Sequence, residues 1–404
     1  MLVQFQLASA LLSLHLSLGK TEARTCPPAT EPQQPMAVFD DGTGATLYVA
    51  IVVSSAGRSY TRLQKWTGHD WQQVGPLLDG VIAALCAYGG DLYAGGELLF
   101  GPGLVNLARW DGHTWQNVGH ASNPDGAVES LTDFQGRLYV GGAFTRIGRR
   151  PADHFARWNG VSWEGLLSRE KAIRASALPG LAAVPASGAA PGAIIYDVKR
   201  LSLATKWSWI AAASDGVRQW NGRQWQKIAA VVFGEVRSLA VWHGHLYAAA
   251  TSEIRHPDAL TTVYGQLARF DGQSWQMVPK APAGPLYALA AGPDGKLYVG
   301  GSFSRAGQLG ASNIACWDGA NWSAVGNGLP GRVNTLVVHE GLLYAGGNFG
   351  AGSQLSAAHS SAMRWDGDEW SPLSRPGRRE PSGSYSFDMA SLLPRRAQTA
   401  APGF

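Results

Sequence analysis

The chain has 404 residues, of which 15% are charged, 51 are glycine and 16 are tryptophan. An average globular protein has roughly 25% charged residues and 7% glycine. The composition therefore excludes helical bundles and coiled coils, which are rich in Ala, Glu, Lys and Leu. A hydrophobic content of 45% excludes disorder over the body of the chain. This balance is typical of an all-β protein.

The formal net charge of +4 is concentrated at the end of the sequence, because residues 374–404 contain five Arg against one Glu and one Asp. A nucleic-acid-binding surface needs Lys and Arg clustered on the folded domain. We therefore expect no nucleic-acid partner. The Pro, Arg, Ser and Gly content of residues 374–404 predicts a disordered basic tail.

The first 18 residues are uncharged and mostly apolar, and small residues follow at Gly19 and Ala23. This pattern predicts a secretory signal peptide over residues 1–23 and a secreted or extracellular-surface protein, although a disordered terminus or a packed helix would give a similar pattern. Residues 24–35 are rich in Pro and polar residues, which predicts a linker. No other apolar run approaches the length of about 20 residues that spans a membrane.

Three cysteines, Cys26, Cys86 and Cys316, leave at least one without an intramolecular partner. No CxxC or Cys/His spacing indicates a metal site, and we interpret Cys86 and Cys316 as small buried hydrophobic residues. One glycosylation sequon begins at Asn321.

An internal repeat dominates the sequence. An aromatic residue, a polar-Gly turn and a Trp five residues after the aromatic recur seven times. These aromatic pairs are Trp66/Trp71, Trp110/Trp115, Trp158/Trp163, Trp220/Trp225, Phe270/Trp275, Trp317/Trp322 and Trp365/Trp370. A Leu-Tyr signature followed by small residues, often Gly-Gly, precedes each pair, with a degenerate copy near Trp209.

Each unit of about 50 residues contains four predicted strands with Gly-containing hairpin turns. Such units stack radially because none can bury both of its faces alone. The sequence therefore predicts an all-β, seven-bladed β-propeller over residues 36–373, with a flexible insertion at 172–193. The first blade is expected to begin on an inner strand at residues 36–40 and the last to end on an outer one at 370–373, so that closure rests on packing without strand exchange.

The repeat resembles the kelch family, which has a double glycine at the end of the second strand, an aromatic in the third and a Trp in the fourth. The glycines match at Gly95-Gly96, Gly141-Gly142, Gly300-Gly301 and Gly346-Gly347. The pattern LYVGG…ARWDGxxW is also similar to the propeller repeats of fungal Rax-type cortical marker proteins and of bacterial surface propellers. The resemblance covers residues 38–373 and implies a galactose-oxidase-type propeller at the cell surface.

We interpret the repeated residues as structural. The aromatics are expected to pack between blades, the glycine pairs to permit close backbone approach or a bulge, and the Asp of the WDG turns to fit the turn and not to ligate calcium. The repeated bases are expected to be exposed or to lie between blades, with a charged rim for an anionic ligand as the alternative. They are Lys65, Arg109, Arg157, Arg269 and Arg364. Trp207 and Trp242 fall outside the repeat and are candidates for a ligand surface.

No catalytic motif is present: GxSxG, HExxH and a P-loop are absent. Kelch-type copper oxidases use two His and two Tyr, one of them cross-linked to Cys, whereas His243 and His245 here fall in a turn between two strands. We therefore expect a non-catalytic scaffold without cofactor or metal that binds a protein or glycan partner at the cell surface. The alternative is a secreted sugar- or polysaccharide-active enzyme, whose two carboxylates no single sequence can exclude.

The loops between strands two and three, and between successive blades, vary widely in length, whereas the other turns are uniformly tight. Binding residues often lie on variable loops that a rigid scaffold holds. We therefore expect recognition through the loops at 144–153, 253–264, 303–312 and 349–361; loop drift without selection is the alternative. Their basic side chains are Arg146, Arg149, Arg150, Arg255, His256 and Arg305.

Overall fold

The computed structural model describes residues 34–55, 57–100, 103–119, 123–152, 154–165, 195–203, 206–220, 225–228, 234–255, 261–272, 274–349 and 362–373. These residues belong to one compact unit that begins at Gln33, and their regular secondary structure consists of β-strands. The predicted signal segment 1–23, the insertion 172–193 and the tail 374–404 lie outside the described residues, as does most of the linker 24–35.

Five antiparallel four-stranded sheets account for most of the described residues, and each is built from one contiguous stretch in simple up-and-down order. Their strands are β10 (Val128–Phe134), β11 (Arg137–Gly142), β14 (Phe155–Trp158) and β15 (Trp163–Gly165); β16 (Ile195–Leu203), β17 (Lys206–Ala213), β18 (Gly216–Trp220) and β19 (Trp225–Lys227); β20 (Glu235–Trp242), β21 (His245–Arg255), β22 (Thr261–Phe270) and β23 (Trp275–Met277); β24 (Leu286–Ala291), β25 (Leu297–Gly301), β28 (Ile314–Trp317) and β29 (Trp322–Ala324); and β30 (Val333–His339), β31 (Leu342–Gly347), β32 (Ala362–Trp365) and β33 (Trp370–Pro372). Two short hairpins, β12 (Arg146–Ile147) with β13 (Arg150–Pro151) and β26 (Arg305–Ala306) with β27 (Leu309–Gly310), are inserted in the first and fourth of these sheets.

The first part of the chain folds differently, as a single nine-stranded sheet. Its strands are β1 (Met36–Asp40), β2 (Ala45–Ser55), β3 (Arg58–Trp66), β4 (Trp71–Gln73), β5 (Leu78–Tyr88), β6 (Asp91–Phe100), β7 (Gly103–Leu104), β8 (Leu107–Trp110) and β9 (Trp115–Asn117). The prediction of seven four-stranded blades is therefore wrong: within the described residues there are five such blades, and residues 36–117 form one joined sheet.

The two halves of this sheet are joined because β4 is too short to cover the edge of β3. It pairs only with Gln64–Trp66, whereas β3 extends back to Arg58 along the ladder with β2. The uncovered edge pairs with the start of β5, Tyr60 opposite Asp79 and Thr61 opposite Leu78. Backbone N–H and C=O groups at a sheet edge require partners, and the early start of β5 provides them.

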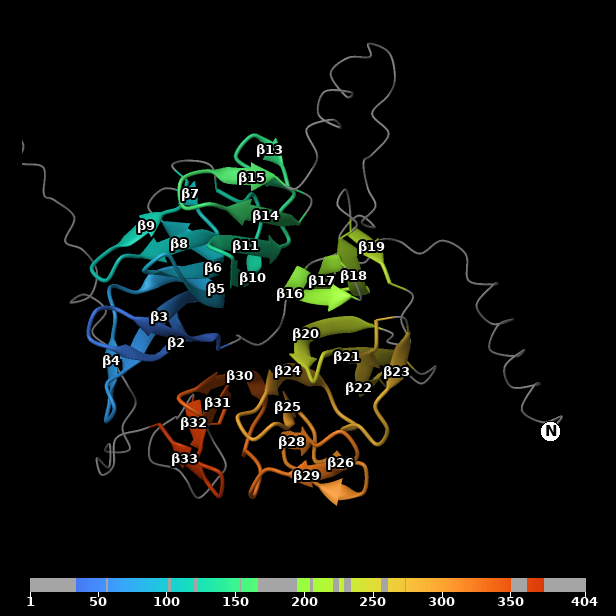
Figure 1. Ribbon diagram of the computed structural model, residues 1–404. Coiled ribbons are helices and arrows are strands. Elements are labelled where there is room, and N and C mark those ends of the chain that lie inside the picture. The colour runs from blue at the N-terminus through green and yellow to red at the C-terminus, as the bar shows by residue number, and fades with distance from the viewer. Residues whose placement is uncertain are drawn as a thin grey trace, which may run out of the picture. The chain divides into compact units, whose positions relative to one another are not determined.

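The sheets follow one another in a closed ring, which is the arrangement of a β-propeller (Figure 1). Each first strand contacts the first strand of the next sheet: β5 contacts β1 and β10, β16 contacts β10 and β20, and β24 contacts β20 and β30. The ring closes where β30 contacts β1. Met36 and Tyr344 share a buried cluster at this junction, so closure rests on packing, as expected.

The repeated aromatics pack within and between sheets. The two members of a pair lie opposite each other on strands three and four, with ring centroids 5.4 Å apart for Trp110 and Trp115. Three of the seven fourth-strand indole N–H groups also donate to carbonyls that follow the fourth strand of the preceding sheet, whereas those of Trp115, Trp163, Trp225 and Trp275 have no hydrogen-bond partner among the described residues. These bonds are Trp71 to Leu373 (2.5 Å), Trp322 to Pro279 (2.9 Å) and Trp370 to Val325 (3.0 Å).

The glycine pairs lie where the second strand is crowded from two sides. A Cβ on Gly95 would come 2.4 Å from Val128 in the next sheet, and one on Gly96 would come 1.9 Å from the carbonyl oxygen of Val81. Any side chain would therefore displace backbone. The prediction that these glycines permit close approach is confirmed.

The WDG segments are tight turns, as predicted. The carboxylate of Asp111 accepts hydrogen bonds from the N–H groups of His113 (2.8 Å) and Thr114 (2.7 Å), which lower its pKa. Gly112 adopts φ of 96°, a conformation that glycine tolerates best. The Asp side chain thus closes its own turn.

Cys316 is buried and Cys86 is half-buried, and neither forms a disulfide with another described residue. Burial raises the pKa of the Cys86 thiol to about 11 and also raises that of Cys316. Both thiols therefore stay protonated near neutral pH, which agrees with packing roles, whereas Cys26 lies outside the described residues. No helix in the described part of the chain is long and apolar enough to span a membrane.

Candidate functional site

The first strands share a β-bulge near their beginning. In β10 the pairing with β11 jumps from Val128 to Ser130, so that Glu129 has no cross-strand partner. The equivalent jump occurs in β5, β16, β20, β24 and β30. We call the bulged residues the bulge ring: Ala83, Glu129, Tyr196, Arg237, Tyr287 and Asn334. A bulge re-aims a side chain and is common beside functional sites.

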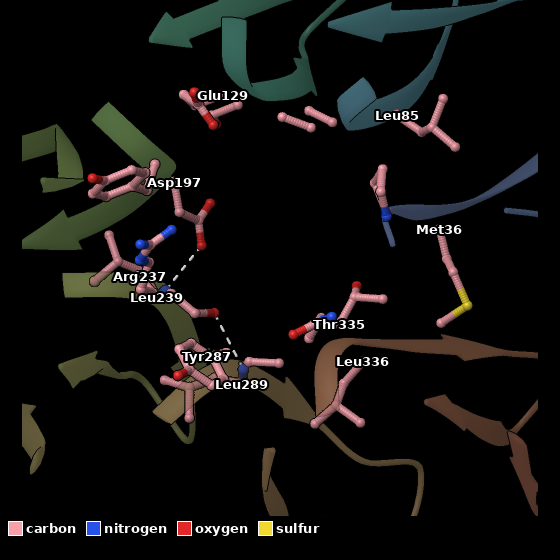
Figure 2. Close-up of a pocket in the computed structure, with 18 of the residues that line it drawn as sticks. Met36, Leu85, Glu129, Asp197, Arg237, Leu239, Tyr287, Leu289, Thr335 and Leu336 are labelled. Carbon is pink, nitrogen blue, oxygen red and sulfur yellow. Dashed lines mark hydrogen bonds between the residues drawn. The ribbon is translucent and has the colours of Figure 1, made fainter. Parts of the chain in front are cut away.

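All six members of the bulge ring line one cavity of about 230 Å³. Figure 2 shows Glu129, Asp197, Arg237 and Tyr287 on one side of the cavity, with Leu239 and Leu289 beside them, and Met36, Leu85, Thr335 and Leu336 on the other. The charged and tyrosine side chains come from β10, β16, β20 and β24, whereas β1 and β5 contribute apolar residues and β30 contributes Asn334, Thr335 and Leu336. The cavity can therefore contact both a polar and an apolar face of a ligand.

Arginines hold the two tyrosines of the ring from the neighbouring sheet. The guanidinium of Arg237 lies 4.5 Å from the ring centroid of Tyr196 and 3.0 Å from the carboxylate of Glu235. Arg332 lies 5.0 Å from the ring of Tyr287. Such cation–π contacts fix the orientation of an aromatic ring, so the tyrosines are pre-organised.

The carboxylate of Asp197 is bonded to other groups of the protein. It accepts a hydrogen bond from the backbone N–H of Leu239 (2.9 Å), which ties β16 to β20, and it pairs with Lys199 (2.9 Å). The hydroxyl of Ser238 similarly accepts from the N–H of Leu289 (3.2 Å), which ties β20 to β24. Dashed lines in Figure 2 mark both backbone bonds. These side chains rigidify the polar wall of the cavity.

Glu129 is different, because its carboxylate has no hydrogen-bond or ion-pair partner among the described residues. Burial raises its pKa, the charges of Glu97 and Glu235 raise it further, and Arg237 opposes the shift. The group therefore protonates more readily than an exposed glutamate. It is the one unpaired carboxyl that the described cavity wall presents to a ligand.

The repeated bases lie within the sheets, beside the Tyr of the second strand. Lys65 is opposite Tyr48 and pairs with Asp41 at 2.6 Å. Arg109 is opposite Tyr93 and pairs with Asp91 at 3.1 Å. Arg157 likewise pairs with Glu164, and Arg269 donates to Gln276 at 2.8 Å. These ion pairs and hydrogen bonds account for four of the five bases without a ligand. The fifth, Arg364, lies opposite Tyr344, and its Nε is buried without a hydrogen-bond partner among the described residues.

The structure brings together three of the predicted basic residues. Arg146, Arg149 and Arg150 lie exposed on the β12–β13 hairpin, where Arg146 donates to the carbonyl of Arg149 (3.1 Å). Arg150 donates to the carbonyl of Trp163 (2.8 Å). Arg305 lies on the equivalent β26–β27 hairpin and donates to Gln308. The guanidiniums of Arg146, Arg150 and Arg305 each donate to a nearby backbone carbonyl.

The other two predicted basic residues of the binding face are Arg255 and His256. Arg255 ends β21, but its side chain and the whole of His256 lie outside the described residues, so the predicted binding face stays a prediction. The hairpin 146–151 follows Gly142, which pairs with Val128 beside the bulge. The bulge ring therefore lies at the end of the sheets from which the predicted loops extend.

Trp242, a predicted ligand-surface residue, is buried, and its indole donates to the carbonyl of Gly295 (2.9 Å). That interpretation is wrong, because Trp242 ends β20 where the neighbouring sheet covers it. Trp207 belongs to β17, but its side chain is not among those described. His243 and His245 flank the β20–β21 turn, as predicted. Asn321 is exposed in its turn, and its glycosylation stays a prediction.

Sequence reasoning missed the bulge ring. A bulge is a property of strand register, which the repeat pattern alone does not reveal. A signal was nevertheless present: near the start of the first strand of the five four-stranded sheets, one position changes among Glu, Tyr, Arg and Asn, whereas the residue before it is Val, Ile or Leu.

Neither a family model nor a curated protein matches this chain. Several solved structures are similar to it, including the following two. The computationally designed Ika8 protein aligns with 83% of this chain and 99% of its own length, at 12% identity and a TM-score of 0.42. An ancestral GH74 enzyme aligns with 81% of this chain but only 45% of its own length, at 15% identity and a TM-score of 0.48. The kelch and Rax-type assignment therefore stays a prediction.

Proposed function

We propose that this protein is a non-catalytic, extracellular interaction scaffold that binds a glycan. The glycan would occupy the cavity lined by the bulge ring, here called the axial cavity, and extend over the loops at the same end. The bulge ring carries this proposal. The β-bulge recurs at these six positions, whereas the residue at the bulge changes among Ala, Glu, Tyr, Arg and Asn. A position that served the fold alone would repeat its residue, as the aromatic and glycine positions do.

The chemistry of the cavity supports a sugar unit as the occupant. Two tyrosine rings and the carboxyl of Glu129 supply stacking surfaces and hydrogen-bonding groups on one side, and the amide of Asn334 adds a hydrogen-bonding group from β30. Apolar side chains on the other side suit the C–H face of a sugar ring. A volume of about 230 Å³ is below the roughly 300–1,000 Å³ of sites for drug-sized ligands. The cavity therefore holds one terminal unit, and the rest of the glycan extends over the loops.

A glycan array with the purified full chain tests this proposal. The side-chain nitrogen of Asn334 is buried and has no hydrogen-bond partner among the described residues. Asn334→Ala should therefore weaken binding roughly tenfold, the effect of losing one ligand hydrogen bond. Asn327→Ala, on an exposed turn, is the matched control. An array without bound glycans, or equal binding by both variants, contradicts the proposal; a protein captured in a parallel pull-down would then identify the partner class as protein.

A sugar-active enzyme is the second candidate, and Glu129 favours it. Glycoside hydrolysis uses two carboxyl groups about 5–10 Å apart, one with a raised pKa that acts as the acid. The raised pKa of Glu129 and the nearby charges of Glu97 and Glu235 are consistent with that chemistry. Release of reducing ends from a polysaccharide by the native protein but not by Glu129→Gln would replace the scaffold proposal with this one.

A further inference from the structure

A row of four side chains crosses the sheets beside the aromatic pairs. In the nine-stranded sheet the row is Asp91, Tyr93, Arg109 and Gln116: Arg109 is opposite both Tyr93 and Gln116, and it pairs with Asp91 at 3.1 Å. A second row contains Asp41, Tyr48, Lys65 and Gln72, in which Lys65 lies 2.6 Å from Asp41. In both rows a long cation on the third strand pairs with a carboxylate near the first turn and lies opposite a glutamine on the fourth strand, to which Arg109 also donates a hydrogen bond.

The sheet of β24, β25, β28 and β29 keeps the carboxylate and the tyrosine of this row but has no cation on its third strand; Lys296, just before β25, pairs with Asp294 instead. Its row is Asp294, Tyr298, Cys316 and Ser323, in the same cross-strand register. Cys316 and Ser323 are much shorter than Arg and Gln. A cavity of about 470 Å³ lies on this row, and its other wall is formed by the next sheet, including Leu343 and Trp365.

The groups that surround a cation in the other rows remain in this cavity. The hydroxyl of Tyr298 donates to Asp294 at 3.1 Å. Burial raises the pKa of Asp294, but hydrogen bonds from Lys296 and Tyr298 outweigh it and the pKa is lowered, so Asp294 is ionised near neutral pH. Asp366 adds a second carboxylate to the lining, and Trp365 adds an aromatic face. Lys296 pairs with Asp294 at 3.1 Å, but both side chains are about 40% exposed (42% and 37%), and exposed pairs are weak.

We propose that this inter-sheet cavity binds the guanidinium group of an arginine side chain supplied from outside the chain. The guest takes the place that Arg109 occupies in its own sheet. Its planar fork matches the carboxylate of Asp294, and the ring of Trp365 offers a stacking face. Lys296 competes with the guest for Asp294, because both are cations. The inference concerns a different cavity from the axial one and does not rest on the proposed glycan function.

Isothermal titration of the full chain with N-acetyl-argininamide tests the proposal. We expect saturable binding in the millimolar range, with no saturation by N-acetyl-citrullinamide, which has the same shape without the charge, and at least fivefold weaker binding of N-acetyl-lysinamide. An acetylated Gly-Arg-Gly amide and free arginine form the two further arms. Comparable binding of the tripeptide identifies a peptide source, whereas binding of free arginine alone identifies a small-molecule source.

Three variants separate this site from non-specific binding. Cys316→Arg should fill the cavity from within, abolish binding and raise the melting temperature. Cys316→Ser, which preserves the space, should bind as the native chain does. Lys296→Met should bind at least threefold more tightly because it removes the competing cation. If neither the native chain nor Lys296→Met binds the arginine derivative, or if citrulline binds equally well, the proposal is wrong, even if Cys316→Arg fails to fold.

Discussion

At the scale of single residues, the charged side chains of the axial cavity are of two kinds: those with ionic partners in the protein, and Glu129, which is available to a ligand. Asp197 and Arg237 face the cavity, but their charges are met by Lys199 and Glu235. Glu129 lies at the bulge of β10, as Arg237 lies at the bulge of β20, but it has no such partner among the described residues. Its free energy in the folded protein must therefore depend on pH, since burial disfavours its charged form.

We expect Glu129→Gln to be more stable than the native protein at pH 7.5, with the difference disappearing below about pH 4. A carboxyl whose pKa is raised by folding stabilises the folded state fully below its unfolded pKa of about 4.3. This stability is lost as the pH rises through the folded pKa. Glutamine does not ionise and avoids the loss. Urea unfolding at the two pH values measures the effect, with the exposed Glu369→Gln as control. A native protein that equals Glu129→Gln at pH 7.5 would contradict the expectation.

The sequence predicts residue roles well where a position repeats and poorly where it does not. The glycine pairs and the fourth-strand tryptophans were interpreted correctly, because steric crowding and inter-sheet packing recur in each unit. The interpretation of Trp242 was wrong, because its indole donates to the carbonyl of Gly295 in another sheet, a contact that the repeat pattern does not show. Glu129 was overlooked because only the strand register shows that it faces the axis.

At the scale of elements, the nine-stranded sheet shows how strand length alters a repeat fold. Each predicted strand of residues 36–117 exists, and the hairpin turns are where the glycines indicated. What the pattern could not give is the length of β2 and β3, whose ladder continues through residues predicted to be a loop. The uncovered edge of β3 then pairs with β5. Pairing between units depends on such edges, which composition and periodicity do not encode.

Thr61 should be critical for this join. Its side chain is fully buried, its hydroxyl donates to the carbonyl of Gly80 (2.8 Å), and it accepts from the N–H of Ile82 (3.1 Å). Thr61→Val keeps the shape but leaves both backbone groups short of one hydrogen bond, which should lower the free energy of unfolding by about 1–3 kcal/mol. Thr61→Ser keeps the hydroxyl and should lose less than half as much. Chemical unfolding of both variants measures this, and an equal loss in the two would show that packing of the methyl group is responsible.

At the scale of the whole molecule, the closure of the ring carries an indole-to-carbonyl hydrogen bond of the kind found at two other junctions between sheets. The bond from Trp71 to Leu373 repeats the bonds from Trp322 to Pro279 and from Trp370 to Val325. The repeat spacing predicted this closed propeller, because units that cannot bury both faces must stack. The number of separate blades did not follow from the spacing, since a β-ladder joins the first two repeats.

The closing contact should form last in folding, which yields a kinetic prediction. Trp71 and Leu373 are 302 residues apart, whereas Trp322 and Pro279 are only 43 apart. Bringing distant segments together costs more chain entropy and is delayed in folding. Replacement of either half-buried Trp by Phe removes one hydrogen bond, worth about 1 kcal/mol. For Trp71→Phe this loss should appear almost entirely as unfolding that is about fivefold faster, with the folding rate unchanged.

Trp322→Phe is the matched control, because it removes an equivalent bond between adjacent units. Its loss should be divided between slower folding and faster unfolding, as expected for a contact that is partly formed in the transition state. Stopped-flow fluorescence over a range of urea concentrations measures both rates for each variant. If Trp71→Phe slows folding as much as Trp322→Phe does, the ring closes before the transition state and the proposed order of assembly is wrong.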